Sequence, residues 1–373
     1  MPASQGIFRR FVVGALILTA VLSTGTVEAQ PQKRRTCPPK MSRCPLRLGK
    51  PHALVPGVND DWHVRSDELG DVSRIGGQLI RFPFTWATVQ PDSPETWDWT
   101  VYDRIFAAAR AQGLGVILEP SAAPCWAHPV TPCPPGLAPE PPDGLHEVQW
   151  QEFVRRALER YENIVAVEVW NEPNVSSFWL GGPDPARYTA LLQATYTAVK
   201  SVRPDLPVLF GGVAAFTPNA PLERGYIDFL RKAYAAGAGG YFDALALHPY
   251  PVPYNRPDYR ERVLGVIAVA REVARQAQHI TIPIWITEEG LTTAGPGAVS
   301  EKAQASRFSA LYKLLARIPR LPVVVLHRYF DQPGAGNPEN GFGVVRPDLS
   351  EKPAYAVTQW DFAHFARGAR HNP

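Results

Sequence analysis

Net charge is nearly absent from this chain. Its 373 residues include 38 Lys and Arg against 35 Asp and Glu, which leaves a formal charge of +3 scattered along the sequence. Nucleic-acid-binding proteins usually concentrate basic residues in a patch or stripe, so we expect no nucleic-acid partner. Apolar residues make up 45% of the chain and charged residues 20%. That composition is typical of a folded protein with a large core and excludes a disordered one.

Long hydrophobic runs are also scarce. The longest uncharged one, Phe11 to Leu22, follows Arg9 and Arg10, and its twelve residues fall short of the ~20 that span a bilayer. Val27-Glu28-Ala29 has the small-residue spacing of a cleavage site. We therefore expect residues 1–29 to be a signal peptide removed near Ala29, with an uncleaved anchor as the alternative. The protein is then secreted, by the general or the twin-arginine route, with no stable membrane insertion.

Cysteine is rare as well, with four residues in the chain: Cys37, Cys44, Cys125 and Cys133. They lack the C-x-x-C spacing of zinc sites, and outside the cytoplasm we expect them to form disulfides. Three pairings are possible. The local pairs Cys37 with Cys44 and Cys125 with Cys133 are favoured because each closes a short loop, although spacing alone does not decide. Residues 30–50 are interpreted as a lead-in that contains Pro and Cys.

Several catalytic motifs are missing from the sequence. It contains no G-x-S-x-G, no H-E-x-x-H, no phosphate-binding G-x-x-x-x-G-K-[ST] and no plausible G-x-G-x-x-G. These absences argue against the corresponding hydrolase, metalloprotease and nucleotide-binding chemistries. Asn59-Asp60-Asp61 is a weak calcium signal, and solvated acids are the simpler account. We expect neither a cofactor nor a metal.

Short β-branched runs alternate with longer amphipathic stretches from about Pro51 onward. The strand candidates are 25 to 50 residues apart, which leaves room for the crossover that a parallel neighbour requires. Apolar spacings of i, i+3, i+4 and i+7 predict helices over 150–161, 188–199, 263–274 and 308–315. The expected strands centre near Val55, Ile80, Ile117, Val167, Leu209, Leu245, Trp285 and Val324.

Eight such units predict an α/β fold, a single-domain (β/α)8 TIM barrel over residues 51–373. A doubly wound open sheet fits the same alternation, but it lacks its Gly-rich turn after the first strand. The Pro-rich loop Ser121–Asp143 follows the third strand and would lie on the rim where barrels bind substrates. It predicts one wall of a cleft, and a braced surface flap is the alternative.

Two strand-like runs end at glutamates. The run Val165–Trp170 stops at Asn171-Glu172-Pro173, and Ile282–Thr287 stops at Glu288-Glu289-Gly290. Carboxylates at the ends of the fourth and seventh strands would face each other across the barrel mouth. Two opposed carboxyl groups suit the cleavage of a glycosidic bond, which needs a proton donor and a nucleophile or base. A single glutamate of this kind is more often a surface residue in a salt bridge.

The segment Val169-Trp-Asn-Glu-Pro-Asn174 resembles the retaining glycoside hydrolases of clan A, most closely the family 39 and family 5 (cellulase-like) types. Further matching segments extend the resemblance over nearly the whole chain after the leader. They are Ile80-Arg-Phe82, Ala123-Pro-Cys-Trp-Ala127, His248-Pro-Tyr250, Trp285-Ile-Thr-Glu288, Gly341-Phe-Gly-Val344 and Lys352-Pro-Ala-Tyr355.

The resemblance implies that Glu172 is the general acid/base and Glu288 the nucleophile. The acid must hold its proton near neutral pH, so burial and a neighbouring negative charge should raise its pKa, whereas the nucleophile must stay ionised. Glu289 is the rival nucleophile. Strand alternation does not decide between the two, and only the family's Thr-Glu-x-Gly register favours Glu288.

Four further residues have implied supporting roles. Arg81 can hold the nucleophile ionised, and a structural pairing with Glu119 or Glu168 inside the barrel is compatible with that role. Asn171 should bind the sugar 2-hydroxyl. Tyr250 should support the nucleophile, and His248 should line the first sugar site.

One departure from the family pattern is at the end of the eighth strand, where a Trp is usual. Here the run is Val325-Leu-His-Arg-Tyr-Phe-Asp331, so His327 or Tyr329 is expected in that place. Trp126 and Trp179 are the candidate stacking platforms for a sugar ring. Weaker candidates are Trp62 and Trp86, and core packing is expected for Trp170.

These observations predict a secreted retaining β-glycosidase that hydrolyses the O-glycosidic bonds of an oligo- or polysaccharide by double displacement through Glu288. Its two carboxyl groups should lie ~5 to 5.5 Å apart, because inverting enzymes need ~6.5 to 9.5 Å. Two alternatives remain: a carbohydrate-binding barrel without catalysis, favoured by the altered eighth strand, and a transglycosylase that uses the same two glutamates.

Overall fold

The structure is a computed structural model that describes residues 52–60, 69–128, 141–215 and 225–369. All of them belong to the compact unit Cys37–Pro373. The predicted signal peptide and lead-in lie outside the described residues, and so do Trp62 and three of the four cysteines. Cys125, the remaining one, has no free thiol, and its pairing with Cys133 stays a prediction. None of the described helices is long and apolar enough to cross a membrane.

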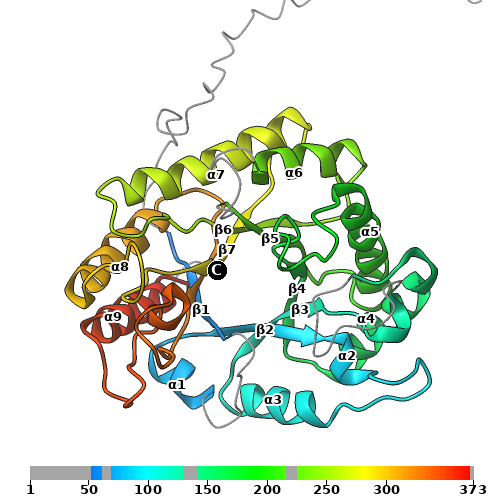
Figure 1. The fold of residues 1–373 in the computed structure, drawn as a ribbon, viewed down its shortest axis with the longest axis horizontal. Coiled ribbons are helices and arrows are strands. Elements are labelled where there is room, and N and C mark those ends of the chain that lie inside the picture. Colours follow the sequence, from blue (N-terminus) through cyan, green and yellow to red (C-terminus); the bar gives the residue numbers. More distant parts are fainter. Residues whose placement is uncertain (1–51, 61–68, 129–140, 216–224, 370–373) are drawn as a thin grey trace, which may run out of the picture. The chain divides into compact units, whose positions relative to one another are not determined.

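Eight parallel strands form a closed barrel in sequence order, and β1 pairs with β8 to close it (Figure 1). Closure confirms the (β/α)8 prediction and excludes the open sheet. All eight predicted strand centres lie within the observed strands: β1 (Val55–Asn59), β2 (Leu79–Thr85), β3 (Gly115–Ser121), β4 (Ile164–Asn171), β5 (Val208–Ala214), β6 (Ala244–His248), β7 (Ile284–Glu289) and β8 (Val323–His327).

Helices surround the barrel in an outer ring (Figure 1). The four helices predicted from apolar periodicity are confirmed as α4, α5, α7 and α8. Each buries one face, as α4 does with Trp150, Phe153 and Val154. The helices among the described residues are α1 (Leu69–Arg74), α2 (Trp86–Val89), α3 (Thr100–Ala111), α4 (Glu147–Arg160), α5 (Pro185–Val202), α6 (Gly225–Ala235), α7 (Tyr259–Gln276), α8 (Glu301–Leu315) and α9 (Pro353–Ala369).

The inward-facing side chains of the barrel form two layers, an apolar one and, closer to the C-terminal ends of the strands, a polar one. The apolar layer includes Leu79, Ile117, Ala166, Ala246 and Val325. Side chains on a strand alternate between its two faces, so the residue two positions further on faces inward again, one layer closer to the C-terminal end. On six strands that next residue is polar and buried: Arg81, Glu119, Glu168, His248, Thr287 and His327. This polar layer is the floor of the candidate site.

Candidate active site

Glu172 reaches the barrel mouth because the alternation of β4 is interrupted. Val169 and Trp170 both pack in the core around the barrel, whereas Asn171 faces inward. Trp170 and Glu172 have left-handed backbones, with φ values of 71° and 39°. Such conformations are costly for non-glycine residues and concentrate at functional sites. The backbone N–H of Glu172 donates to Gly212 O at 3.0 Å, which fixes the turn.

Glu288 lies at the end of β7 with both carboxyl oxygens bound. Arg81 Nη1 donates to its Oε1 at 2.8 Å, and the Tyr250 hydroxyl donates to its Oε2 at 2.8 Å. The side chain is only 8% exposed. A carboxylate held on both oxygens by charged and neutral donors is ionised and fixed in orientation.

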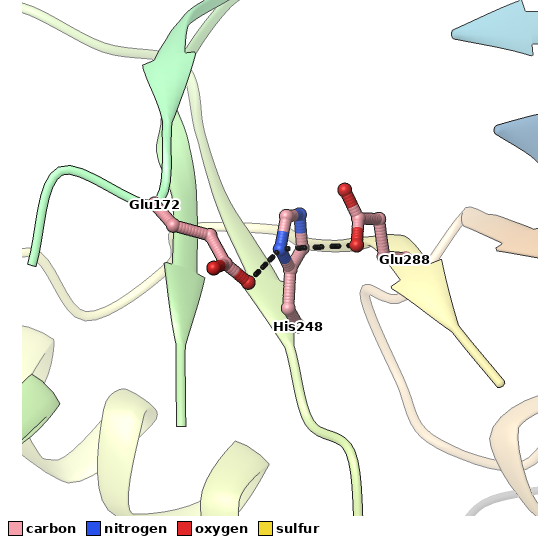
Figure 2. Close-up of side chains that lie close together, drawn as sticks. All are labelled: Glu172, His248 and Glu288. Carbon is pink, nitrogen blue, oxygen red and sulfur yellow. Dashed lines mark hydrogen bonds and ion pairs between the residues drawn. The ribbon is translucent and has the colours of Figure 1, made fainter. Parts of the chain in front are cut away.

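His248 of β6 lies between the two glutamates (Figure 2). Its Nδ1 is 2.8 Å from Glu172 Oε1, joined by a hydrogen bond, and 3.6 Å from Glu288 Oε2. One oxygen of each glutamate and a ring nitrogen of His248 all lie within 4.8 Å of one another. The facing oxygens of the two carboxyl groups are thus within 4.8 Å of each other, which favours the short separation of retaining enzymes over the ~6.5 to 9.5 Å of inverting ones.

Gly212 explains why this imidazole fits. A Cβ at this position would lie 2.1 Å from His248 Nε2 and 2.7 Å from Glu168 Oε1. His248 Nε2 lies 3.1 Å from Thr287 Oγ1 and 3.9 Å from Glu168 Oε1. The ring is fully buried, and both its nitrogens have partners, so His248 has one orientation between the glutamates.

Arg81 carries both of the roles that the sequence left open. It pairs with Glu288 at 2.8 Å and, from the same guanidinium, with Glu168 at 2.8 Å and Glu119 at 3.1 Å. One cation thus faces three buried carboxyl groups in the floor of the site. Asn171 is oriented by the same group, because its Oδ1 accepts from Arg81 Nη2 at 2.8 Å. The amide nitrogen of Asn171 is then left to bind another partner.

The environments of the two glutamates shift their pKa values in opposite directions. Burial raises the pKa of Glu172, and the hydrogen bond from His248 offsets only part of that rise. Burial would also raise the pKa of Glu288, but His248 and Arg81 more than offset it and lower the value to about 2. Near neutral pH this favours an ionised Glu288 beside a Glu172 that holds its proton more strongly than an exposed glutamate. One group is suited to attack and the other to donate.

A dependence of activity on pH follows from these shifts. We expect kcat/KM for a β-glycoside with a poor leaving group to fall at low pH as Glu288 is protonated, and to fall at high pH as Glu172 loses its proton above the usual value of 4.5. The measurement is a pH profile of kcat/KM, with Glu172→Ala as the control that should lack the alkaline limb. An alkaline limb that persists in the variant would assign that titration to another group.

Comparison with known proteins bears on the fold and the site. No family model matches the chain. Over 136 residues it is 32% identical to a beta-xylosidase from Geobacillus stearothermophilus, and this stretch covers 32% of the chain and 25% of that protein. The chain therefore spans a quarter of the length of this curated relative.

Solved structures match over most of the chain. A family 39 glycoside hydrolase from Bacteroides cellulosilyticus has a TM-score of 0.66 at 22% identity, with 84% of this chain and 64% of that one covered. A monomeric beta-xylosidase from Caulobacter crescentus has 0.63 at 21% identity, covering 84% and 69%. The chain shares the (β/α)8 fold of these proteins. A GH5_18 protein from Streptomyces cattleya agrees at 0.61 and 16% identity, covering 87% and 82%.

Within the barrel, Glu289 is not part of the mouth. The register between β7 and β8 shifts between Ile286 and Glu289, so Thr287 and Glu288 both contact residues of the site. Glu289 is fully buried, and its charge acts on Tyr312 of α8, in the layer outside the barrel. Burial raises its pKa well above the usual value. The geometry therefore selects Glu288 over its neighbour.

The two tryptophans expected to stack on sugar differ in the structure. Trp126 is half-buried on the turn after β3, where its indole N–H donates to Gln90 O at 2.9 Å and its ring packs edge-on against Trp86. Trp179 is 2% exposed and packs between Trp170 and Tyr188. The prediction for Trp179 is wrong, because its ring completes the core outside β4. Trp170 is a core residue, as expected. Trp86 is also fully buried, so the weaker prediction that it stacks on a sugar is wrong.

Of the two candidates for the usual Trp position, the structure selects His327. Its ring lies 5.9 Å from that of Tyr250, and its Nδ1 is 3.9 Å from Glu288 Oε2. Tyr329 is 5% exposed and packs against Phe330 and Tyr355. The prediction for Tyr329 is wrong, because β8 ends at His327 and the chain beyond it leaves the barrel interior.

The residues that could hold a metal ion lie at the barrel mouth. Among the described residues, Glu172, His248 and Glu288 form the group of three such side chains with ligand atoms close together. An ion there would fill the space between the two carboxyl groups. The hydrogen bonds from Arg81 and Tyr250 already orient Glu288 without one.

Sequence reasoning missed Asn59 and Thr287 as parts of the site and treated Glu119 and Glu168 only as possible partners of Arg81. A signal was present, because a glutamate interrupts each of the apolar runs Val116-Ile-Leu-Glu119 and Ala166-Val-Glu168. A charged residue in a buried strand must be paired, so these two pointed to a polar layer. Asn59 was considered only within the weak calcium signal Asn59-Asp60-Asp61, because nothing in the sequence relates the end of β1 to Arg81 or His327.

Proposed function

We propose that the protein is a glycoside hydrolase that cleaves a β-linked sugar with retention of configuration. The observation that carries the proposal is the pair of carboxyl groups at the barrel mouth, which lie close together and have pKa values shifted in opposite directions. The similarity to beta-xylosidases of family 39 supports a β-glycosidase, and a β-xyloside is the first substrate to test.

The proposed reaction has two steps, and both glutamates take part in each. In the first, a Glu288 oxygen bonds to the anomeric carbon while Glu172 transfers its proton to the glycosidic oxygen, and the bond from carbon to that oxygen breaks. In the second, the Glu172 carboxylate takes a proton from water as the water oxygen attacks the same carbon, which releases Glu288. Two inversions at one carbon give net retention.

The configuration of the first product tests this proposal. We expect proton NMR of a freshly started reaction with an aryl β-xyloside, or the best substrate of an aryl β-glycoside panel, to show the β-anomer first and the α-anomer only as mutarotation proceeds. An α-anomer formed first would assign inversion. Sugar binding without cleavage of any panel member would support the carbohydrate-binding alternative, and glycosides formed from added alcohols would support transglycosylation.

We also propose that the protein acts outside the cytoplasm on an oligo- or polysaccharide. This part rests on the sequence of residues 1–29, which lie outside the described residues. An exported hydrolase meets carbohydrate polymers that do not enter a cell.

A further inference from the structure

The backbone that carries Glu172 is held in an unfavourable conformation. Trp170 and Glu172 both have positive φ values, 71° and 39°, and neither is a glycine. Such residues persist only where their surroundings leave the backbone no alternative. The contacts on either side of Glu172 therefore determine where its carboxyl group lies.

A tyrosine hydroxyl supports the strand before Glu172. Tyr188 of α5 accepts a hydrogen bond from the Gly211 N–H at 2.6 Å and donates one to Val169 O at 3.2 Å, so it joins β4 to β5. Its ring is fully buried and packs against Phe210 at a centroid distance of 4.8 Å, which fixes the position of the hydroxyl. Burial raises the pKa of Tyr188, so the hydroxyl keeps the proton that it donates.

The two strands can approach each other here because residue 211 is a glycine. A Cβ at this position would lie 2.6 Å from Trp170 O, still closer to Val169 O and 3.2 Å from the Tyr188 hydroxyl. The backbone of β4 therefore lies directly against β5 where it becomes left-handed. Removing the hydroxyl would take an acceptor from the Gly211 N–H and a donor from Val169 O, at a buried site where such losses are costly.

A buried asparagine supports the chain after Glu172. Asn174 is 6% exposed, and its Oδ1 accepts from the Ala214 N–H at 3.0 Å while its Nδ2 donates to Ala214 O at 2.8 Å. Both bonds go to the last residue of β5. Between these two supports, the Glu172 N–H donates to Gly212 O. The turn is thus tied to β5 before, at and after Glu172.

We propose that Tyr188 and Asn174 are positioning residues for Glu172, which they hold in the place required for proton transfer. The inference rests on the proposed function and adds two residues to it. Glu288 lies on β7, and its hydrogen-bond donors come from other parts of the barrel. Loss of either support should therefore impair proton transfer to the leaving group more than attack by Glu288.

The dependence of activity on the leaving group tests the proposal. The probes are the 2,4-dinitrophenyl and the phenyl β-glycosides of the sugar that the enzyme cleaves fastest, because the first leaving group needs no proton and the second does. We expect Tyr188→Phe and Asn174→Ala to lower kcat/KM for the phenyl glycoside by at least about tenfold, and for the dinitrophenyl glycoside by less than about threefold. Equal losses on both substrates would overturn the proposal, because the two residues would then only stabilise the fold.

The chain offers a matched control for each variant. Tyr102 of α3 makes the same kind of bridge on β2, where its hydroxyl accepts from the Thr85 N–H at 2.7 Å and donates to Pro83 O at 3.3 Å. Asn163 precedes β4, and its Nδ2 donates to Leu114 O at 3.3 Å. We expect Tyr102→Phe and Asn163→Ala to leave the ratio of the two kcat/KM values as it is in the wild type.

A double-mutant cycle shows whether the two supports act through Glu172. In the Glu172→Ala background, we expect Tyr188→Phe and Asn174→Ala to lower kcat/KM for the phenyl glycoside by less than about twofold more, because the group that they position is gone. A further loss as large as in the wild-type background would overturn the proposal. Each variant is assayed below its thermal unfolding midpoint, and either one alone decides the outcome for its residue.

The outcomes separate the two proposals. Absence of hydrolysis by the wild type with every sugar of the panel would contradict the proposed function. Hydrolysis by the wild type, without a selective loss on the phenyl glycoside in the two variants, would overturn the positioning roles alone.

Discussion

Replacing Glu288 with Gln should reduce the hydrolysis of an activated aryl glycoside by at least about 10⁴-fold. The amide keeps the size of the side chain and its hydrogen bond to one donor, but it cannot form the bond to the anomeric carbon. An activated leaving group is the sharper probe, because it needs no proton from Glu172. The measurement is kcat/KM. The thermal unfolding midpoints of the wild type and the variant should be the same under the assay conditions, so that unfolding does not account for the loss.

The adjacent glutamate offers a matched control. Glu289→Gln should retain most of the activity, because Glu289 faces the layer outside the barrel. A mass-spectrometric label from a 2-fluoro glycoside should likewise fall on Glu288. Inactivation by Glu289→Gln with an active Glu288→Gln would reverse the assignment.

The stability of Glu289→Gln should differ from that of the wild type in a way that depends on pH. The pKa of Glu289 is raised in the folded protein, so its contribution to stability is fully present below the unfolded value of 4.5 and is lost as pH rises through the folded value. Glutamine does not ionise, so the variant lacks this loss of stability at higher pH. We expect Glu289→Gln to gain stability relative to the wild type between mildly acidic and mildly alkaline pH, by about 1.4 kcal/mol for each unit by which burial raises the pKa. The measurement is denaturant unfolding of both proteins at one mildly acidic and one mildly alkaline pH.

Replacing Glu172 with Ala should reduce kcat/KM by about 10² to 10⁴-fold for substrates with a poor leaving group, such as an oligosaccharide. Those substrates need the proton that Glu172 supplies. For an activated aryl glycoside the first step needs little help, so the glycosyl-enzyme should accumulate and slow the second step. An initial burst of released phenol is the expected observation.

Azide should restore turnover of the activated substrate by Glu172→Ala. The small anion fits the space left by the carboxyl group and attacks the anomeric carbon without a base, which yields a β-glycosyl azide. Glu162→Ala, an exposed glutamate at the other end of β4, is the control and should behave as the wild type does. Equal losses on good and poor leaving groups, with no azide effect, would remove Glu172 from the acid/base role.

Much of the fold could be predicted from the sequence because its signals are local. Each strand is a short apolar run bounded by turn residues, and each of the four predicted helices shows an apolar face at helical spacing, as in α4. These patterns arise wherever one face of an element is buried. Eight strand-and-helix units then leave few topologies open. The barrel was favoured because the Gly-rich turn of a doubly wound open sheet is absent after the first strand.

The site could be predicted only as far as strand ends. Placing Glu172 and Glu288 at the C-terminal ends of β4 and β7 required only the run lengths and the barrel. The prediction for Trp179 failed because burial depends on the whole neighbourhood of a side chain: its indole packs against Trp170 of β4 and Tyr188 of α5, two elements whose relative position no local pattern gives. The prediction for Tyr329 failed because no local sequence pattern marks the residue at which the chain leaves the barrel interior after β8.

The sequence by itself determined the eight strands, the barrel they form and the two acids at its mouth, because strand periodicity and turn residues act over a few positions. The tertiary structure decided which glutamate of Glu288 and Glu289 enters the site, since a register shift in β7 overrides simple alternation. It also decided the partners of Arg81 and the position of Asn59 between Arg81 and His327. Those depend on hydrogen bonds between strands far apart in the chain, and such contacts exist only once the barrel has closed.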